Sequence, residues 1–154
     1  MKKSGIISLF IAIVFFSAAG CKKNDGGNLT ASSSHNSTAG HNMSGACQSC
    51  HISGGSGPGW WNVAGTVYSQ DLSTVSPNGT IYFYDNPNGT GTPVATLEVD
   101  ANGNFYTSSS ILPAGGAYPQ VKDVSGNMQI MPQLCTSGNC NACHGVTTTK
   151  IWVN

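Results

Sequence analysis

Two short stretches hold most of the side chains in this chain that can do chemistry. Residues 47–51 read Cys-Gln-Ser-Cys-His and residues 140–144 read Cys-Asn-Ala-Cys-His, so both match C-x-x-C-H. Two thiols at this spacing can add to the two vinyl groups of one porphyrin, and the adjoining histidine reaches the iron from the same face. The pattern therefore predicts two haem c groups, with thioether bonds at Cys47, Cys50, Cys140 and Cys143 and with His51 and His144 as iron ligands.

The ligand on the other side of each iron decides what that haem does. A second strong ligand favours electron transfer, whereas an open position allows small-molecule chemistry. His41, shortly before Cys47, is a candidate for bis-histidine ligation at one iron. Met131 or Met128 is a candidate for histidine–methionine ligation at the other, which raises the potential. The plainer interpretation of Met131 is a core side chain, and His35 is expected to be a solvated linker residue.

The remaining cysteine near the second motif keeps other uses of these thiols open. Once four thiols bind haem, Cys135 has no further cysteine in its part of the chain to pair with. An odd thiol in a secreted chain indicates a position beside the haem or an intermolecular disulfide. With Cys140, Cys143 and His144 it would instead suit a zinc knuckle, although oxidising compartments disfavour free thiolate clusters. Plain disulfides are a further alternative, whereas no βαβ pattern supports a thioredoxin-like motif.

Charge is scarce in this chain. Charged residues make up 8% of the sequence, against about a quarter in ordinary globular proteins. Lys2 and Lys3 lie at the start of the chain, which leaves four lysines against six acids beyond them and a formal charge of 4 − 6 = −2. Nucleic-acid binding needs a cationic face that neutralises phosphates. The composition therefore argues against a nucleic-acid partner.

The first 20 residues have the pattern of a secretory signal. Two lysines precede the apolar residues 6–16, and small residues follow. The apolar run is too short to span a bilayer comfortably. Residues 18–21, Ala-Ala-Gly-Cys, resemble a bacterial lipobox, in which the cysteine is lipidated and becomes the new N-terminus. The resemblance implies a lipid anchor at Cys21, and Lys22 in place of a retention aspartate implies the outer membrane, with the domain periplasmic or surface-exposed.

Composition divides the chain into three parts. Residues 1–20 are the predicted signal peptide, residues 21–46 a lipidated N-terminus and flexible linker, and residues 47–154 a β-sandwich domain with a C-x-x-C-H motif at each end. No stretch after the leader shows a sustained helical period. Short apolar runs between Gly, Pro and Asn turns predict strands at 62–69, 80–85, 94–99, 104–108, 121–124 and 128–131. We therefore expect an all-β, Ig-like or Greek-key sandwich with irregular haem-binding segments at both ends.

Three motifs between the two haem-binding segments also bear on the fold. Residues 65–67 read Gly-Thr-Val, residues 99–105 read Val-Asp-Ala-Asn-Gly-Asn-Phe, and residues 112–115 read Leu-Pro-Ala-Gly before a tyrosine at 118. They resemble the first strand, the D-x-x-G-x-F turn and the return of a carboxypeptidase-regulatory-like (transthyretin-like) sandwich. In such a turn Gly103 can take the left-handed conformation, and Phe105 is expected to point into the sandwich. The resemblance implies a scaffold without catalytic residues.

The two-motif frame as a whole resembles small dihaem c-type cytochrome lipoproteins of bacteria. The resemblance implies an electron carrier rather than an enzyme, which exchanges electrons with redox protein partners or an external acceptor. Trp60, Trp61 and Trp152 are expected to cover haem surface or to pack at the rim of the core. A rival hypothesis is a surface-anchored binding or structural sandwich whose C-x-x-C pairs are disulfides or zinc ligands. A haem enzyme such as a peroxidase is a third, although only His35 and His41 offer a distal acid–base group.

Overall fold

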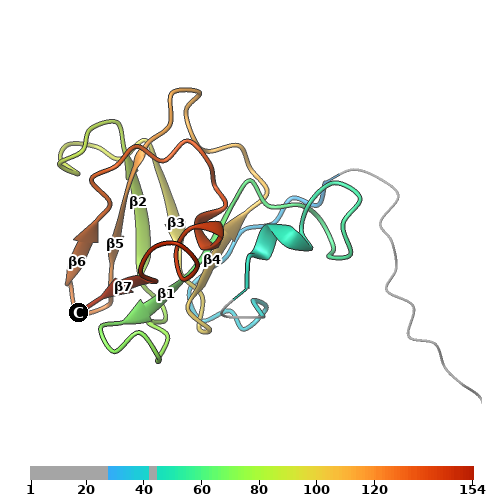
Figure 1. The fold of residues 1–154 in the computed structure, drawn as a ribbon, viewed down its shortest axis with the longest axis horizontal. Coiled ribbons are helices and arrows are strands. Elements are labelled where there is room, and N and C mark those ends of the chain that lie inside the picture. Colours follow the sequence, from blue (N-terminus) through green and yellow to red (C-terminus); the bar gives the residue numbers. More distant parts are fainter. Residues whose placement is uncertain (1–27, 42–44) are drawn as a thin grey trace, which may run out of the picture.

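Short strands and single helical turns make up the computed structural model of this chain, which describes residues 28–41 and 45–154 (Figure 1). The predicted signal peptide and lipobox, with Cys21, lie outside the described residues. Among the described residues no helix has the length and apolar character needed to cross a membrane. The elements are the 3-10 turns η1 (Cys47–Ser49) and η2 (Cys140–Ala142) and the strands β1 (Val63–Ser69), β2 (Thr80–Tyr84), β3 (Ala95–Glu98), β4 (Asn104–Thr107), β5 (Tyr118–Lys122), β6 (Met128–Ile130) and β7 (Ile151–Val153).

The strands form two sheets, which confirms the all-β prediction. One sheet has the order β4–β1–β7 and the other the order β3–β2–β5–β6. Neighbouring strands are antiparallel except β1 and β7, which run parallel. The chain crosses from one sheet to the other after β1, β3, β4 and β6, so each sheet contains strands that are distant in the sequence.

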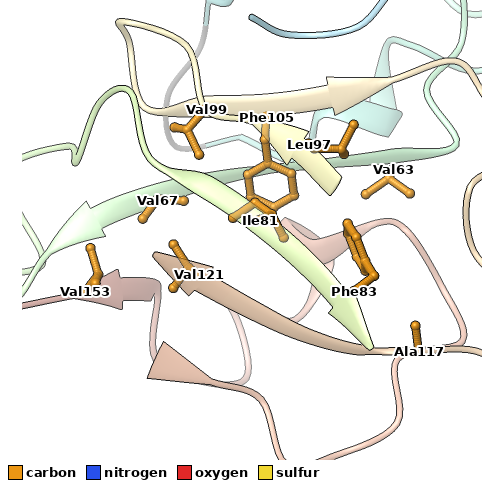
Figure 2. Close-up of a cluster of buried hydrophobic side chains, with 10 residues drawn as sticks. All are labelled: Val63, Val67, Ile81, Phe83, Leu97, Val99, Phe105, Ala117, Val121 and Val153. Carbon is orange, nitrogen blue, oxygen red and sulfur yellow. The ribbon is translucent and has the colours of Figure 1, made fainter. Parts of the chain in front are cut away.

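Apolar side chains from both sheets meet between them and form the core (Figure 2). In β3, Leu97 is buried while Thr96 and Glu98 are exposed, as the alternating pattern predicts. Phe83 and Phe105 are the largest fully buried side chains, and they come from opposite sheets. The other core residues of this cluster are Val63, Val67, Ile81, Val99, Ala117, Val121 and Val153.

The turn before β4 has the conformation that its sequence predicts. Gly103 has a φ of +77°, and its N–H donates to the carbonyl of Asp100 at 3.1 Å. The buried Asp100 carboxylate accepts hydrogen bonds from the N–H groups of Asn102 and Asn104, at 2.9 and 2.8 Å. Phe105 then points into the core with 2% of its surface exposed. The side chain of Asp100 therefore holds the turn that starts β4.

Residues 31–33 lie along the outer edge of β4, within the stretch for which composition predicts a flexible linker. The N–H of Ser33 donates to the carbonyl of Tyr106 at 2.8 Å, and the N–H of Ser108 donates to the carbonyl of Ala31 at 2.9 Å. An open sheet edge offers backbone partners to a passing segment even when that segment has few apolar side chains to bury.

Five strands lie within one residue of their expected boundaries at each end, whereas β5 and β7 depart from the prediction. The predicted strand at residues 121–124 is observed as β5, which starts at Tyr118 and includes Pro119. Pro119 faces Met131, one residue past the end of β6, so the N–H that proline lacks falls outside the regular β5–β6 pair, while its carbonyl accepts a hydrogen bond from the N–H of Met131 at 2.9 Å. Strand β7 was not predicted, because three residues are too few to show a period.

Candidate haem-attachment site

The two C-x-x-C-H motifs fold into the same tight turn. The N–H of His51 donates to the carbonyl of Cys47 at 3.0 Å, and the N–H of His144 donates to the carbonyl of Cys140 at 3.0 Å. In each motif the backbone N–H of the second cysteine also donates to the carbonyl of the first, at 3.3 Å in the first motif and 3.2 Å in the second. In a helical turn, side chains three and four positions apart lie on one side. Each turn thus gathers two thiols and one imidazole, as haem c attachment requires.

Both motif histidines are held in the same tautomer. Nδ1 of His51 lies 3.1 Å from the carbonyl oxygen of Pro58, and Nδ1 of His144 lies 2.7 Å from the carbonyl oxygen of Thr149. A carbonyl oxygen can only accept, so Nδ1 carries the proton and Nε2 keeps its lone pair. A hydrogen bond from the other ring nitrogen is the usual support of a metal-binding histidine. Both imidazoles therefore fit the role of a metal ligand through Nε2.

The first motif encloses its histidine. His51 is 7% exposed, and Trp61 stacks on its ring with a centroid distance of 4.6 Å and an interplanar angle of 26°. Gly57 passes so close that a Cβ atom there would lie 2.8 Å from Cε1 and Nδ1 of the ring. Gln48 donates from Nε2 to the carbonyl of Trp61 at 2.7 Å, which ties the motif to the stacked tryptophan. The ring of His51 is thus restrained on more than one side.

His41 lies beside the first motif. Its ring centroid is 5.8 Å from that of His51, and the two rings are tilted by 51°. Two imidazoles that bind one metal from opposite sides have centroids about 6 Å apart, because each metal–nitrogen bond is about 2 Å long. The structure therefore brings His41 to the distance at which a sixth ligand for the first haem is expected.

The second motif lies in a loop that leaves the β4–β1–β7 sheet beside β1 and then rejoins it. Asn139 pairs with Ala64 in the parallel sense, and β7 pairs in the same sense with the end of β1. Between these two contacts, residues 140–150 leave the sheet and carry the motif. Lys150 is the last residue of this loop, and its ammonium lies 4.0 Å from the centroid of the Tyr68 ring. One side of β1 thus anchors the motif before and after it.

A pocket of about 540 Å³ adjoins the second motif and reaches into the sandwich. Its volume lies within the range of about 300–1,000 Å³ that is typical of cofactor and ligand sites. Cys140, Cys143, His144 and Met131 all contribute to its wall. The remaining wall is rich in apolar side chains, which include Ile81, Phe83, Phe105, Val121, Leu134 and Trp152. This donor set and this apolar lining fit a covalently bound porphyrin.

The first cysteine of each motif is the more protected one. Burial raises the pKa of the Cys47 thiol. A hydrogen bond to Cys135, followed by burial, raises the pKa of Cys140, and the same contact lowers the pKa of Cys135 to about 7. In contrast Cys50 is exposed, and hydrogen bonds from Ser56 and Ser49 lower its pKa. Cys135 therefore lies against a predicted attachment cysteine.

Several other predicted residues have different surroundings from those expected. His35 is not a free linker side chain, because its Nε2 lies 2.9 Å from the carbonyl oxygen of Gly79 and its N–H donates to Glu98. Met131 lines the pocket, whereas Met128 is 53% exposed on β6 and is not among the lining residues. Of the two methionines that the sequence offers as iron ligands, only Met131 therefore lies at the pocket beside the second motif.

The described part of the chain shows no preformed site for the alternative zinc knuckle. There, no three or more His, Cys, Asp or Glu side chains converge in a way that could hold a metal ion. The four residues of that alternative, Cys135, Cys140, Cys143 and His144, all belong to this part. Haem requires no such convergence, because the porphyrin supplies four of the iron ligands.

Three contributors to the site escape sequence reasoning. Gly57 and Gly65 allow close approach to a motif, since a Cβ at Gly65 would lie 3.0 Å from Cβ of Cys140. Asn141, inside the second motif, is buried and bonded to β1. The glycines stand among many others, and an intervening residue of C-x-x-C-H is unrestricted, so the sequence carried no signal for these roles.

Comparison with known proteins finds no family model, curated protein or solved structure that matches this chain. The functional argument therefore depends on the geometry of the two motifs.

Proposed function

We propose that the chain is a c-type cytochrome of the cell envelope, which carries electrons on two covalently attached haems. The observation that carries the proposal is the repeated geometry of the motifs. Each turn groups two thiols with a histidine whose Nδ1 faces a backbone carbonyl, at 3.1 Å for His51 and 2.7 Å for His144. Disulfide-bonded C-x-x-C pairs would have no need of a histidine held in this tautomer. Covalent haem needs both features.

The protein's own part in this function is to hold and orient. Cys47, Cys50, Cys140 and Cys143 would each add an S–H bond across a vinyl group, so that sulfur bonds to one carbon and hydrogen to the other. His51 and His144 would bind iron through Nε2. Haem held by these residues would supply one-electron redox chemistry. Apolar side chains line much of the pocket beside the second motif, and the polarity around a haem is one of the factors that set its potential.

The proposed sixth ligands follow from position. His41 would serve the first haem, given its ring centroid 5.8 Å from that of His51. Met131 would serve the second, because it shares a pocket wall with His144. Haem iron with a second strong ligand favours electron transfer over small-molecule chemistry. We therefore propose a carrier rather than an enzyme.

The proposed setting is the outer membrane, through a lipid on Cys21, with redox proteins or an external acceptor as partners. Cys21 and the residues that precede it lie outside the described residues. Incorporation of labelled fatty acid into wild type, and its loss in Cys21→Ser, tests the anchor independently of the haems.

Mass spectrometry of protein made together with a haem-attachment system tests the cofactor. The expected mass includes two haems, and the Soret band should survive acid–acetone extraction. The matched control is the same protein made without that system. A mature chain without added haem would overturn the proposal and favour an anchored binding or structural sandwich. Carbon monoxide on the reduced protein then tests the carrier role, since ready binding would show an open iron.

A further inference from the structure

One buried amide connects the two motifs. Asn141 is 7% exposed, and its Oδ1 accepts a hydrogen bond from the N–H of Thr66 in β1 at 3.1 Å. Its Nδ2 donates to the hydroxyl of Thr66 at 3.2 Å and to the carbonyl of Gly45 at 3.0 Å. Gly45 stands two residues before Cys47, and Asn141 directly follows Cys140. The amide therefore bonds the second motif both to β1 and to the chain that enters the first motif.

Strand β1 brings the first cysteine of the second motif close to this junction. A Cβ at Gly65 would lie 2.5 Å from the Phe105 ring and 3.0 Å from Cβ of Cys140, so only glycine allows this approach. The charge of Cys47 contributes to the raised pKa of Cys140, after the larger effects of Cys135 and burial. That contribution agrees with proximity of the two thiols. Figure 1 shows η1 (blue-green) outside the strands and η2 (red) nearer to them.

We propose that the two motifs form one dihaem centre, in which the porphyrin edges bonded to Cys47 and Cys140 face each other and Asn141 is the positioning residue. The inference depends on the proposed function for its cofactors, but the juxtaposition of the motifs is a property of the chain. A thioether places a porphyrin edge next to the cysteine that bears it. Two cysteines at one junction therefore place two porphyrin edges there.

The arrangement has a measurable electrostatic consequence. Reduction of one iron removes a positive charge from the neighbourhood of the other, and charges interact strongly where water is excluded. The second electron is therefore harder to add than the first. The two unpaired spins of the diferric protein also interact, and this dipolar interaction falls with the cube of their distance.

Electron paramagnetic resonance of the diferric holoprotein tests the pair. The wild type is expected to show broadened signals that differ from the sum of two isolated haems. Asn141→Leu removes all three hydrogen bonds, and we expect at least a twofold loss of the interaction at unchanged haem content. Asn127→Leu is the control, because it removes an amide that bridges Asp123 and the carbonyl of Asn154, outside both motifs. Asn141→Asp, which keeps the acceptor for Thr66, serves if the leucine variant does not fold.

Two results would overturn the inference. Wild-type spectra that equal the sum of two isolated haems would show that the motifs hold their haems apart. A haem–haem spin interaction that is unchanged in the Asn141 variants would show that Asn141 does not position the two motifs.

A cross-linking experiment separates this inference from the proposed function. A full-length chain with Cys47 and Cys140 as its only cysteines (C21S, C50S, C135S, C143S) is made without haem and treated with a short bifunctional thiol reagent. Rapid intramolecular cross-linking, at least tenfold slower when Asn141→Leu is added, supports the juxtaposition even if wild type carries no haem. Absence of cross-linking in the folded chain would overturn it even if two haems are present.

Discussion

The two C-x-x-C-H motifs have the same backbone and different surroundings. In the first, His51 is buried between a stacked tryptophan and a closely passing glycine, with His41 nearby. In the second, His144 is only partly buried and faces a pocket that also contains Met131 and the extra thiol Cys135. The shared turn meets the demands of attachment, which are local. The two motifs differ in the candidate sixth ligand, in the exposure of the histidine and in the presence of a neighbouring third thiol. Such differences set the potential of a haem once it is bound.

The largest expected effect comes from removal of either iron ligand. His51→Ala and His144→Ala should each abolish the low-spin signal of one haem, about half of the total, and leave the other intact. The reason is that each Nε2 serves one iron. Electron paramagnetic resonance with haem counting by mass spectrometry distinguishes the two variants. Loss of both signals in either variant would show that the two sites fold as a unit.

Removal of the proposed sixth ligands should distinguish the two haems. His41→Ala is expected to open the first iron to carbon monoxide, and Met131→Leu is expected to lower the potential of the second, because a thioether ligand favours the higher potential. Potentiometric titration measures the shift. Met128→Leu is the control, since Met128 is exposed on β6 and lies away from the pocket lining. A titration of Met131→Leu that matches the control would show that Met131 packs in the protein and does not bind iron.

A methyl group beside His51 should affect only the first motif. In Gly57→Ala the new Cβ would lie 2.8 Å from the imidazole, so the ring or the loop must move. Overpacking of this kind costs about 1–3 kcal/mol, and we expect a lower free energy of unfolding and a shifted potential of the first haem. Gly115→Ala is the control, because a Cβ there meets no atom within 4 Å. Equal unfolding midpoints for the two variants would contradict the restraint on His51.

The smallest expected effect concerns the extra thiol. Oxidation of Cys135 and Cys140 to a disulfide releases two protons and gives two electrons to an envelope thiol oxidant, and the bonded Cys140 can no longer add to a vinyl group. Cys135→Ser should therefore reduce the fraction of chains with one haem, measured by intact-mass analysis. Cys135 is the one described cysteine outside the two motifs, and it lies against the second, so occupancy of the first motif should not change. An unaltered distribution of one-haem and two-haem chains would exclude this competition.

The local features of this protein could be predicted from the sequence. The two motifs, the turn at Gly103 and the burial of Phe105 depend on residues a few positions apart, whose spacing limits the backbone directly. The alternation in β3 likewise identified its buried face. Such short-range patterns also predicted an all-β fold, which two sheets confirm.

Only the tertiary structure decided how these features meet. The contact between Gly45 and Asn141 joins residues 96 positions apart, and neither residue type marks it in advance. Docking of residues 31–33 on β4 and the choice of Met131 over Met128 beside the pocket likewise depend on sheet order and register. Composition describes what a segment can bury, whereas an open strand edge elsewhere in the chain determines where it binds. For that reason the sequence by itself determined which groups this protein brings to its chemistry, and the fold determined their neighbours.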